Sequence, residues 1–371
     1  MALDVDALIR PKIRELQAYI PGRPVEVLER RLGIASAVQL AANENPLGPS
    51  PRALEAIAQS ASKLNRYPDG GGYYLKERLA ELLGVTPAHV ALGGGSNELI
   101  ELLVHLFVAP GDDVVVSHPT FLMYGVSVRL LGGRLTAVPG RGLAHDLEAM
   151  AAAIGPRTRV VIVCNPNNPT GTMVPRSEFD AFLARVPERV VVVSDEAYHE
   201  YVEDPAYPRT LDRLAEERPL VVLRTFSKIY SLAGLRVGYA VARPELASLF
   251  DRVRLPYNVN TLAQAAALAS LDDPGHVERS RRVNREGKLQ LSHALGRLGL
   301  TVHPSHTNFL LVDVGRDSRP LCAALEARGV LLRDLVAFGM APEFVRVTVG
   351  SADENRRLVA ALSEVLARPG G

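Results

Sequence analysis

Lysine is scarce in this sequence, and one of its five lysines lies where an amine could do chemistry. Lys228 follows an apolar run at residues 220–223, and its neighbours Phe226 and Ile229 are apolar as well. Burial near the end of a strand disfavours the charged ammonium and lowers the lysine pKa, so that the neutral amine becomes available for Schiff-base chemistry. A lysine on the protein surface is the alternative interpretation, because most lysines are exposed.

Groups that bind anions flank this lysine. Thr225 and Ser227 carry hydroxyls, and Arg236, eight residues after the lysine, could hold a phosphate through two hydrogen bonds. Upstream, Gly95 and Ser96 end a glycine run before an apolar helix predicted over 99–107. The free N–H groups and the dipole of such a helix start favour an anion. No Gly-Lys-Ser/Thr follows, so the run is not a nucleotide P-loop; a simple helix start is the alternative.

Four further residues lie close to the ends of apolar runs. Asp195 follows the run at 190–193 and would suit a ligand cation, and Tyr198 lies one helical turn further on. Asn168 belongs to the stiff loop Asn-Pro-Asn-Asn-Pro-Thr-Gly after the run at 160–163, and Tyr124 could stack on a flat ligand. The alternatives are a helix-capping acid, a tight turn and an ordinary core tyrosine.

Together these residues describe one ligand. It has a flat ring, a phosphate arm, a phenolic oxygen, a basic ring nitrogen and an aldehyde that reacts with an amine. Pyridoxal 5′-phosphate (PLP) has all five features, and the sequence therefore predicts PLP as the cofactor.

Continuous apolar runs alternate with helical patterns between about residues 50 and 244. The runs cover 114–116, 160–163, 190–193, 220–223 and 237–241. Such runs are typical of strands that are covered on both faces, so we predict an α/β fold with a mostly parallel central sheet. Ligands of these sheets bind at the carboxyl ends of the strands, which is where Lys228 and Asp195 fall.

The pattern changes after about residue 255. A long charged helix is predicted over 273–298, followed by a strand at 308–312, a helix at 319–328, a strand at 344–349 and a last helix that begins with a capping box at 351–354. Short helices at 6–18 and 25–32 precede a Pro- and Asn-rich crossing loop. We predict an N-terminal arm (1–45) that packs with the small domain and a partner subunit, a large domain (46–255) and a small α+β domain (256–371).

Composition excludes several function classes. Lys+Arg number 42 and Asp+Glu 41, so the net charge of +1 gives no case for a nucleic-acid partner. Cys164 and Cys322 lie far apart, which excludes a disulfide framework and a CxxC metal site. No secretory signal and no apolar stretch of about 18 residues is present. We expect a cytoplasmic protein with no metal, nucleic-acid or membrane partner.

From about residue 19 to 350 the chain resembles the fold-type I PLP-dependent aminotransferases. The motifs are Asn-Pro-Asn-Asn-Pro-Thr-Gly at 165–171, Ser-Asp-Glu-Ala-Tyr at 194–198, and Ser-Lys at 227–228 followed by Arg236. Within this family, the sequences at 42–51, 66–69, 223–228 and 255–260 are similar to those of members that act on L-histidinol phosphate. The segment at 121–123, Phe-Leu-Met, departs from the small and polar residues expected there.

The resemblance implies a role for each candidate residue. Lys228 would carry PLP and, once released, move a proton between the substrate Cα and the cofactor C4′. Asp195 would keep the pyridine nitrogen protonated, Tyr198 and Asn168 would hydrogen-bond the phenolic oxygen, and Tyr124 would stack on the ring. The residues implied for the phosphate are Gly95, Ser96, Thr225, Ser227 and Arg236.

The resemblance also implies substrates and a partner. Arg346 would bind an acidic substrate group, with Arg333, Tyr19 and Asn45 as further substrate-binding residues. Tyr67 would reach the phosphate in the other subunit, which implies a homodimer with shared active sites. The implied reaction converts L-histidinol phosphate and 2-oxoglutarate to imidazole-acetol phosphate and L-glutamate in histidine biosynthesis, with ping-pong kinetics.

Other functions remain as alternatives. On the same scaffold these are an aromatic amino-acid transaminase and a threonine-phosphate decarboxylase. The effector domain of a PLP-dependent transcription regulator is disfavoured, because the N-terminal segment is too short for a DNA-binding domain. A pseudoenzyme is disfavoured because the lysine, the aspartate and both phosphate elements are present.

Overall fold

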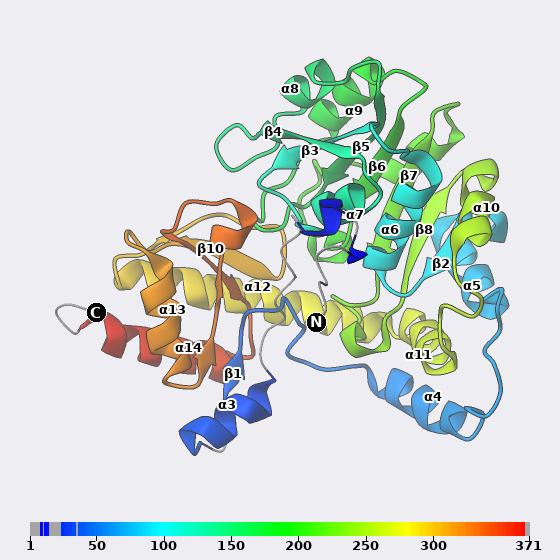
Figure 1. The fold of residues 1–371 in the computed structure, drawn as a ribbon. Helices are drawn as coiled ribbons and strands as arrows, with labels where there is room; N and C mark the ends of the chain where they lie inside the picture. The colour runs from blue at the N-terminus through cyan, green and yellow to red at the C-terminus, as the bar shows by residue number, and fades with distance from the viewer. Residues whose placement is uncertain (1–7, 10, 15–23, 35, 368–371) are drawn as a thin grey trace, which may run out of the picture.

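The computed structural model describes residues 8–9, 11–14, 24–34 and 36–367. A larger part is built on a central sheet, and a smaller part surrounds a second sheet (Figure 1). The long charged helix α12 (Pro274–Arg297) extends from the smaller part toward the larger one. Its bounds agree with the helix predicted over 273–298.

The central sheet has seven strands in the order β2-β8-β7-β6-β5-β3-β4. Strand β8 is antiparallel to its two neighbours and all other pairs are parallel, which confirms the mostly parallel α/β prediction. The strands are β2 (Val90–Gly93), β3 (Asp113–His118), β4 (Arg134–Pro139), β5 (Thr158–Cys164), β6 (Val191–Asp195), β7 (Leu220–Thr225) and β8 (Gly238–Ala242).

Two of these strands were not predicted. Strand β4 is at the edge of the sheet and is largely exposed, so its Arg-Leu-Thr-Ala-Val-Pro sequence has no continuous apolar run. Strand β2 has only four residues, and its glycine belongs to the run that was interpreted as a helix start. Both strands depend on pairing with a neighbour more than on their own composition.

Side chains alternate between two apolar layers across the sheet. Val114 and Val116 pack into one layer, whereas Val115 packs into the other. The first layer includes residues of α6 (Ser96–Phe107), α7 (Met123–Leu130) and α10 (Pro244–Val253). The second includes residues of α4 (Pro51–Ala61), α5 (Tyr73–Leu83), α8 (Leu147–Ala152), α9 (Arg176–Arg185) and α11 (Thr261–Leu271). Burial on both faces explains the continuous apolar runs.

The smaller sheet is antiparallel, with the order β12-β13-β10-β9. Helix α12 packs here with α13 and α14, and the predicted capping box Ser351–Glu354 starts α14. These elements are β9 (Thr301–Val302), β10 (Phe309–Asp313), β12 (Arg333–Asp334), β13 (Phe344–Thr348), α13 (Ser318–Glu326) and α14 (Ala352–Leu366). The predicted strands and helices of this region are therefore present.

The N-terminal segment joins the smaller part. After α2 (Pro11–Arg14) and α3 (Val25–Leu32), strand β1 (Val38–Gln39) pairs in parallel with β11 (Val330–Leu331). Val38 and Leu40 lie in the same apolar cluster as residues of α12, β10 and α14. Most of the helix predicted over 6–18 lies outside the described residues.

Helix α11 shows where packing and the predicted domain boundary differ. It follows residue 255, yet Ala263, Ala266 and Ala267 pack into the core of the larger part, against α4 and α5. The change in packing thus falls at α12. The division into 1–45, 46–255 and 256–371 stays a prediction.

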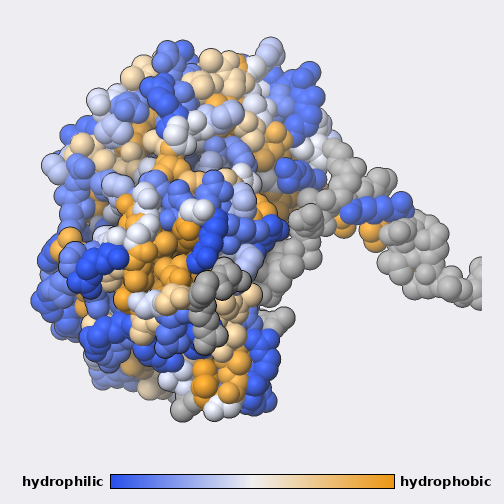
Figure 2. Space-filling model, turned by 90° about the vertical axis from the view of Figure 1, so that its left-hand side faces the viewer, coloured by the Kyte–Doolittle hydropathy of each residue, from blue (hydrophilic) through white to orange (hydrophobic). Residues whose placement is uncertain are grey.

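Figure 2 shows the face on the side of the smaller sheet, which is mostly hydrophilic with hydrophobic residues gathered near its middle. Within the described parts of the chain, no helix combines the length and the apolar character needed to cross a membrane.

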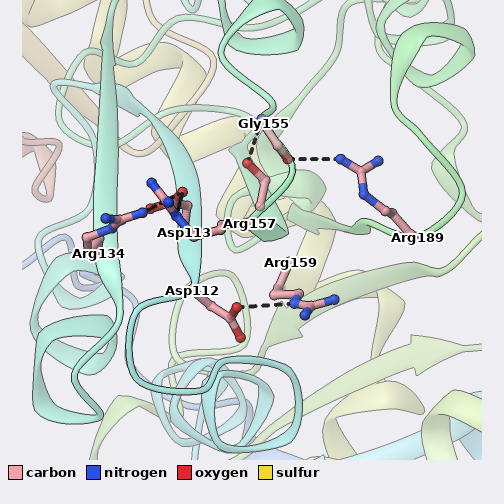
Figure 3. Close-up of polar contacts among 8 residues, drawn as sticks. Asp112, Asp113, Arg134, Gly155, Arg157, Arg159 and Arg189 are labelled. Atoms are coloured by element: carbon pink, nitrogen blue, oxygen red, sulfur yellow. Dashed lines mark hydrogen bonds and ion pairs between the residues drawn. The ribbon is translucent and has the colours of Figure 1, made fainter.

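Ion pairs line the amino ends of the parallel strands (Figure 3). Arg134 at the start of β4 donates two hydrogen bonds to Asp113 at the start of β3, of 2.8 and 3.0 Å. Arg159 in β5 donates to Asp112 at 3.2 Å. Both arginines are about half exposed, so these pairs contribute little to stability.

Candidate active site

A cavity of about 810 Å³ opens at the carboxyl ends of the parallel strands and reaches the smaller sheet. Strands β5, β6 and β7 end in its wall, as the sheet topology predicts. Ten of the predicted site residues line this one cavity: Ser96, Asn168, Asp195, Tyr198, Thr225, Ser227, Lys228, Arg236, Arg333 and Arg346.

Lys228 stands just beyond the end of β7, and its amine lies within the cavity wall. Its Nζ donates to the backbone oxygens of Asn43 at 3.2 Å and Ala42 at 3.4 Å, and lies 5.7 Å from the ring centroid of Tyr198. Burial, followed by the neighbouring positive charge of Arg346, lowers the pKa of Lys228 to about 8. About a tenth of the amine is therefore neutral at pH 7, far more than for a lysine of ordinary pKa.

Asp195 ends β6 and is only 3% exposed. Its Oδ2 accepts a 2.6 Å hydrogen bond from the hydroxyl of Tyr124, and its Oδ1 accepts one from the N–H of Ala197 at 3.2 Å. Burial raises the pKa of Asp195 to about 6, against the opposing effect of these hydrogen bonds. A cationic group of a ligand next to this carboxylate would offset the cost of burying it.

Tyr124 is placed differently from what the sequence suggested. It is fully buried behind Asp195 and does not border the cavity, whereas Phe121 does. The two rings meet edge to face, with centroids 5.6 Å apart. Phe121 is thus the aromatic residue of this segment that borders the cavity, and Tyr124 instead hydrogen-bonds the aspartate. The start of α7 at Met123 decides this, because it directs the two side chains to different sides.

Asn168 and Arg346 connect the two sheets across the cavity. Arg346, on β13, donates from one terminal nitrogen to Asn168 Oδ1 at 2.5 Å and from the other to the backbone oxygen of Ala41 at 2.8 Å. Its guanidinium also lies 5.3 Å from the ring centroid of Phe309. Residue Arg333 pairs with Arg346 in the β12–β13 ladder, so both arginines reach the same end of the cavity.

A cradle for an anion forms where α6 and the segment after β7 border the cavity. Gly95 adopts φ +88°, and a Cβ there would come within 2.5 Å of the Arg236 guanidinium, so only glycine permits this approach. Arg236 donates to the hydroxyl of Ser227 at 3.3 Å, and the Thr225 hydroxyl accepts from the Ser227 N–H at 3.1 Å. Ser96 starts α6, whose free N–H groups and positive dipole end lie beside this arginine.

The remaining predicted residues lie elsewhere. The amide of Asn45 donates to the backbone oxygen of Ile229 and to Ser280, each at 2.9 Å, and is not part of this cavity; Asn43 is. Tyr67 is 81% exposed, is outside the cavity of its own chain, and stacks on Tyr257 with centroids 4.6 Å apart. Tyr19 lies outside the described residues.

Several residues that line the cavity were not selected from the sequence, among them Phe121, Asn97 and Asn43. Asn97 follows the selected Ser96, and the departure from the expected sequence at 121–123 was the available signal for Phe121. Asn43 begins the same Asn-Glu-Asn sequence that contains Asn45. Nothing in residue type separates the two asparagines; the positive φ of Asn43, +56°, decides which side chain turns inward.

Comparison with known proteins gives a consistent result. The family model described as "Aminotransferase class I and II" matches residues 35–362. The chain belongs to this family. It is 48% identical over 362 residues to a histidinol-phosphate aminotransferase of Moorella thermoacetica, covering 96% of this chain and 94% of the relative. It is 49% identical over 366 residues to histidinol-phosphate aminotransferase 2 of Pseudomonas aeruginosa, covering 98% and 99%.

A solved structure shares the fold. The histidinol-phosphate aminotransferase of Sinorhizobium meliloti, in complex with pyridoxal-5′-phosphate, superposes with a TM-score of 0.89 at 34% identity, covering 96% of this chain and 97% of that one. The fold-type I prediction is thereby confirmed.

The residues of the cavity fit PLP. Lys228 offers an amine of lowered pKa, Asp195 offers a buried carboxylate for a protonated ring nitrogen, and Arg236 with the start of α6 offers a cradle for a phosphate. Gly238 keeps that cradle close to the sheet, because a Cβ there would come within 2.7 Å of the Ser96 nitrogen.

Proposed function

We propose that the chain transfers the amino group of L-histidinol phosphate to 2-oxoglutarate, giving imidazole-acetol phosphate and L-glutamate in histidine biosynthesis. The proposal rests on one arrangement: a lysine amine, a buried carboxylate, an anion cradle beside the larger sheet and two arginines on the smaller sheet all line the same cavity. Similarity to histidinol-phosphate aminotransferases over nearly the whole chain supports the choice of substrate.

Lys228 is the residue that moves the proton. When bound, PLP supplies an electron sink that stabilises the charge left on the substrate Cα when that carbon loses its proton. With its pKa near 8, the Lys228 amine would accept this proton from the substrate Cα and donate one at C4′ of the cofactor. The carbonyl groups of Asn43 and Ala42 hold the amine in place between the two events.

Side chains of the cavity wall would hold the cofactor. Asp195, oriented by Tyr124, would keep the ring nitrogen protonated, and Phe121 would cover the ring face. Tyr198 and Asn168 would hydrogen-bond the phenolic oxygen. The phosphate of the cofactor would be held by Gly95, Ser96, Thr225, Ser227 and Arg236.

Two anionic substrates use the same positive end of the cavity in turn. Arg346 and Arg333 would bind the phosphate of histidinol phosphate in one half-reaction and the distal carboxylate of 2-oxoglutarate in the other. Because one site serves both substrates, the amino donor must leave as its keto product before the acceptor binds, which produces ping-pong kinetics.

The chain works as a cytoplasmic homodimer in this proposal. Exposed aromatic and apolar side chains, Tyr67, Tyr73, Tyr74, Leu255 and Tyr257, supply a surface for a second copy. Tyr67 would reach from this surface to the phosphate of the partner's cofactor. The free thiols of Cys164 and Cys322 suit a reducing compartment.

A single-turnover substrate comparison tests the function. Purified enzyme loaded with PLP is mixed with L-histidinol phosphate, L-phenylalanine or L-threonine phosphate, and conversion of the cofactor to its amine form is followed by absorbance. We expect histidinol phosphate to react at least ~10²-fold more efficiently, because of the three compounds only it combines a phosphate for the two arginines with an imidazole ring. Equal or faster conversion by phenylalanine would make the chain an aromatic transaminase, and loss of CO2 from threonine phosphate would make it a decarboxylase.

A further inference from the structure

Asn43 lies at the centre of the cavity wall, between the smaller sheet and Tyr198. It is buried, and its backbone has the left-handed φ of +56° that asparagine tolerates better than most residues. Its side-chain nitrogen donates a 2.8 Å hydrogen bond to the hydroxyl oxygen of Tyr198. Its backbone carbonyl accepts hydrogen bonds from the Lys228 amine at 3.2 Å and from the Asn308 side chain at 3.0 Å. One residue therefore contacts both Tyr198 and the lysine amine.

Thr348 orients the amide of Asn43. The hydroxyl of Thr348, on β13, accepts a hydrogen bond from the Asn43 backbone N–H at 3.0 Å and donates one to Asn43 Oδ1 at 3.2 Å. A hydroxyl has only one proton, and the backbone bond leaves that proton for Oδ1. The amide oxygen consequently faces Thr348, and the NH2 group faces Tyr198.

This orientation decides what the Tyr198 hydroxyl can do. A phenol also has a single proton, and its oxygen accepts the hydrogen bond from Asn43, so its own proton remains for an acceptor on the cavity side. We propose that Asn43 is a positioning residue that directs the hydroxyl proton of Tyr198 onto the phenolic oxygen of PLP. This inference rests on the proposed contact between Tyr198 and the cofactor.

Other charges act on the same hydroxyl and must stay constant in a test. Burial raises the pKa of Tyr198; Arg346 on β13 opposes this effect, whereas Cys164 on β5 and Asp195 on β6 add to it. The Lys228 amine lies over the Tyr198 ring at 5.7 Å from its centroid. The variants below leave these four groups in place.

Four variants separate the possibilities. Tyr198→Phe removes the hydroxyl and gives the change in PLP absorbance that complete loss of this hydrogen bond produces. Asn43→Gly deletes the amide while keeping the positive φ and the carbonyl that holds Lys228, because glycine adopts this conformation without strain. Asn43→Asp replaces the donor by an acceptor, which draws the Tyr198 proton away from the cavity; because it also adds a negative charge, the uncharged Asn43→Gly and Thr348→Val decide the test. Thr348→Val removes the hydroxyl that orients the amide and that also accepts from the Asn43 backbone N–H.

The measurement is the pH midpoint of the visible absorbance of bound PLP, which requires no turnover. Donation to the phenolic oxygen stabilises the deprotonated chromophore, so loss of the donor raises the midpoint. We expect Tyr198→Phe to raise it by about 1–2 pH units and Asn43→Asp by a similar amount. Asn43→Gly should raise it by about 0.5–1 unit, and Thr348→Val by about 0.3 unit.

The outcomes distinguish two failures. If Tyr198→Phe leaves the midpoint unchanged, the proposed contact between Tyr198 and PLP is wrong, and the inference about Asn43 fails with it. If Tyr198→Phe shifts the midpoint but Asn43→Gly and Thr348→Val do not, the contact stands and the role of Asn43 is refuted. Should Asn43→Gly fail to fold, the near-isosteric Thr348→Val decides alone: an unchanged midpoint refutes the role.

Discussion

The two ends of the central sheet carry charged residues of opposite character. At the amino ends, Asp112, Asp113, Arg134 and Arg159 form ion pairs at the surface (Figure 3). At the carboxyl ends, Asp195 and Lys228 are held among apolar and polar neighbours, and burial is the largest cause of the change in their pKa values.

The difference shows how a site can be recognised. Each amino-end aspartate pairs with an arginine that is about half exposed, and such a pair contributes about 0–1 kcal/mol. Burying a charge at the carboxyl ends costs far more free energy. Such residues are typical of functional sites, where a ligand supplies the opposite charge or the hydrogen bonds that offset this cost. Shifted pKa values in a cavity therefore mark the functional end of the sheet, whereas the number of charges does not.

Removing the buried amine gives the largest expected effect. We expect Lys228→Ala to lower kcat by ~10⁴-fold or more, because Lys228 supplies the only lysine amine among the described residues that line the cavity. Steady-state transamination is the measurement. Lys288→Ala is the matched control: that lysine is also half-buried and donates to the backbone oxygen of Ser305, and its loss should leave kcat within about threefold. Near-normal turnover by Lys228→Ala would contradict the assigned role.

Asp195→Asn should separate function from stability. We expect kcat to fall ~10²–10³-fold, because an amide does not keep the ring nitrogen protonated. The PLP-free protein should become more stable at pH 7, by at most about 3 kcal/mol, since a buried charge is removed. Thermal unfolding of both apoproteins against pH measures this.

The pH dependence has a definite sign. The folded pKa of Asp195, about 6, is above its ordinary value of 3.8, so the folded protein binds the proton more tightly than the unfolded chain. Its contribution to stability is complete below about pH 4 and is lost as the pH rises through 6. Wild type and Asp195→Asn should therefore differ least at low pH. A constant difference from pH 4 to 7 would refute this explanation.

At the substrate end we expect an effect on binding. Arg346→Gln keeps a hydrogen-bond donor beside Asn168 but removes the positive charge. KM should rise by about 10–100-fold for histidinol phosphate and for 2-oxoglutarate alike, because both present an anion to this end. An increase for only one substrate in steady-state kinetics would show that the two anions bind at different places.

The amino end should give the smallest effect. We expect Arg159→Ala to change the free energy of unfolding by less than about 1 kcal/mol and to leave kcat and KM unchanged, since its partner Asp112 is at the surface. Chemical denaturation and steady-state kinetics check both values. A large loss of activity would contradict the conclusion that the functional charges lie only at the carboxyl ends of the strands.

Much of the fold and the cofactor site followed from sequence patterns. Five strands buried on both faces appear as continuous apolar runs, and the ends of those runs located Lys228 and Asp195 at one edge. The edge strand β4 and the packing of α11 against the larger core could not be predicted from sequence patterns, because both depend on contacts with distant segments.

The sequence by itself determined which chemical groups this protein can bring to a reaction: one lysine after a buried strand, an aspartate at the next strand end, and glycines with an arginine for a phosphate. Only the tertiary structure decided which neighbouring side chains face the cavity. Phe121 rather than Tyr124, and Asn43 rather than Asn45, line it. The physical reason is that side-chain direction depends on backbone dihedrals and on packing against distant strands, which residue type and spacing do not specify.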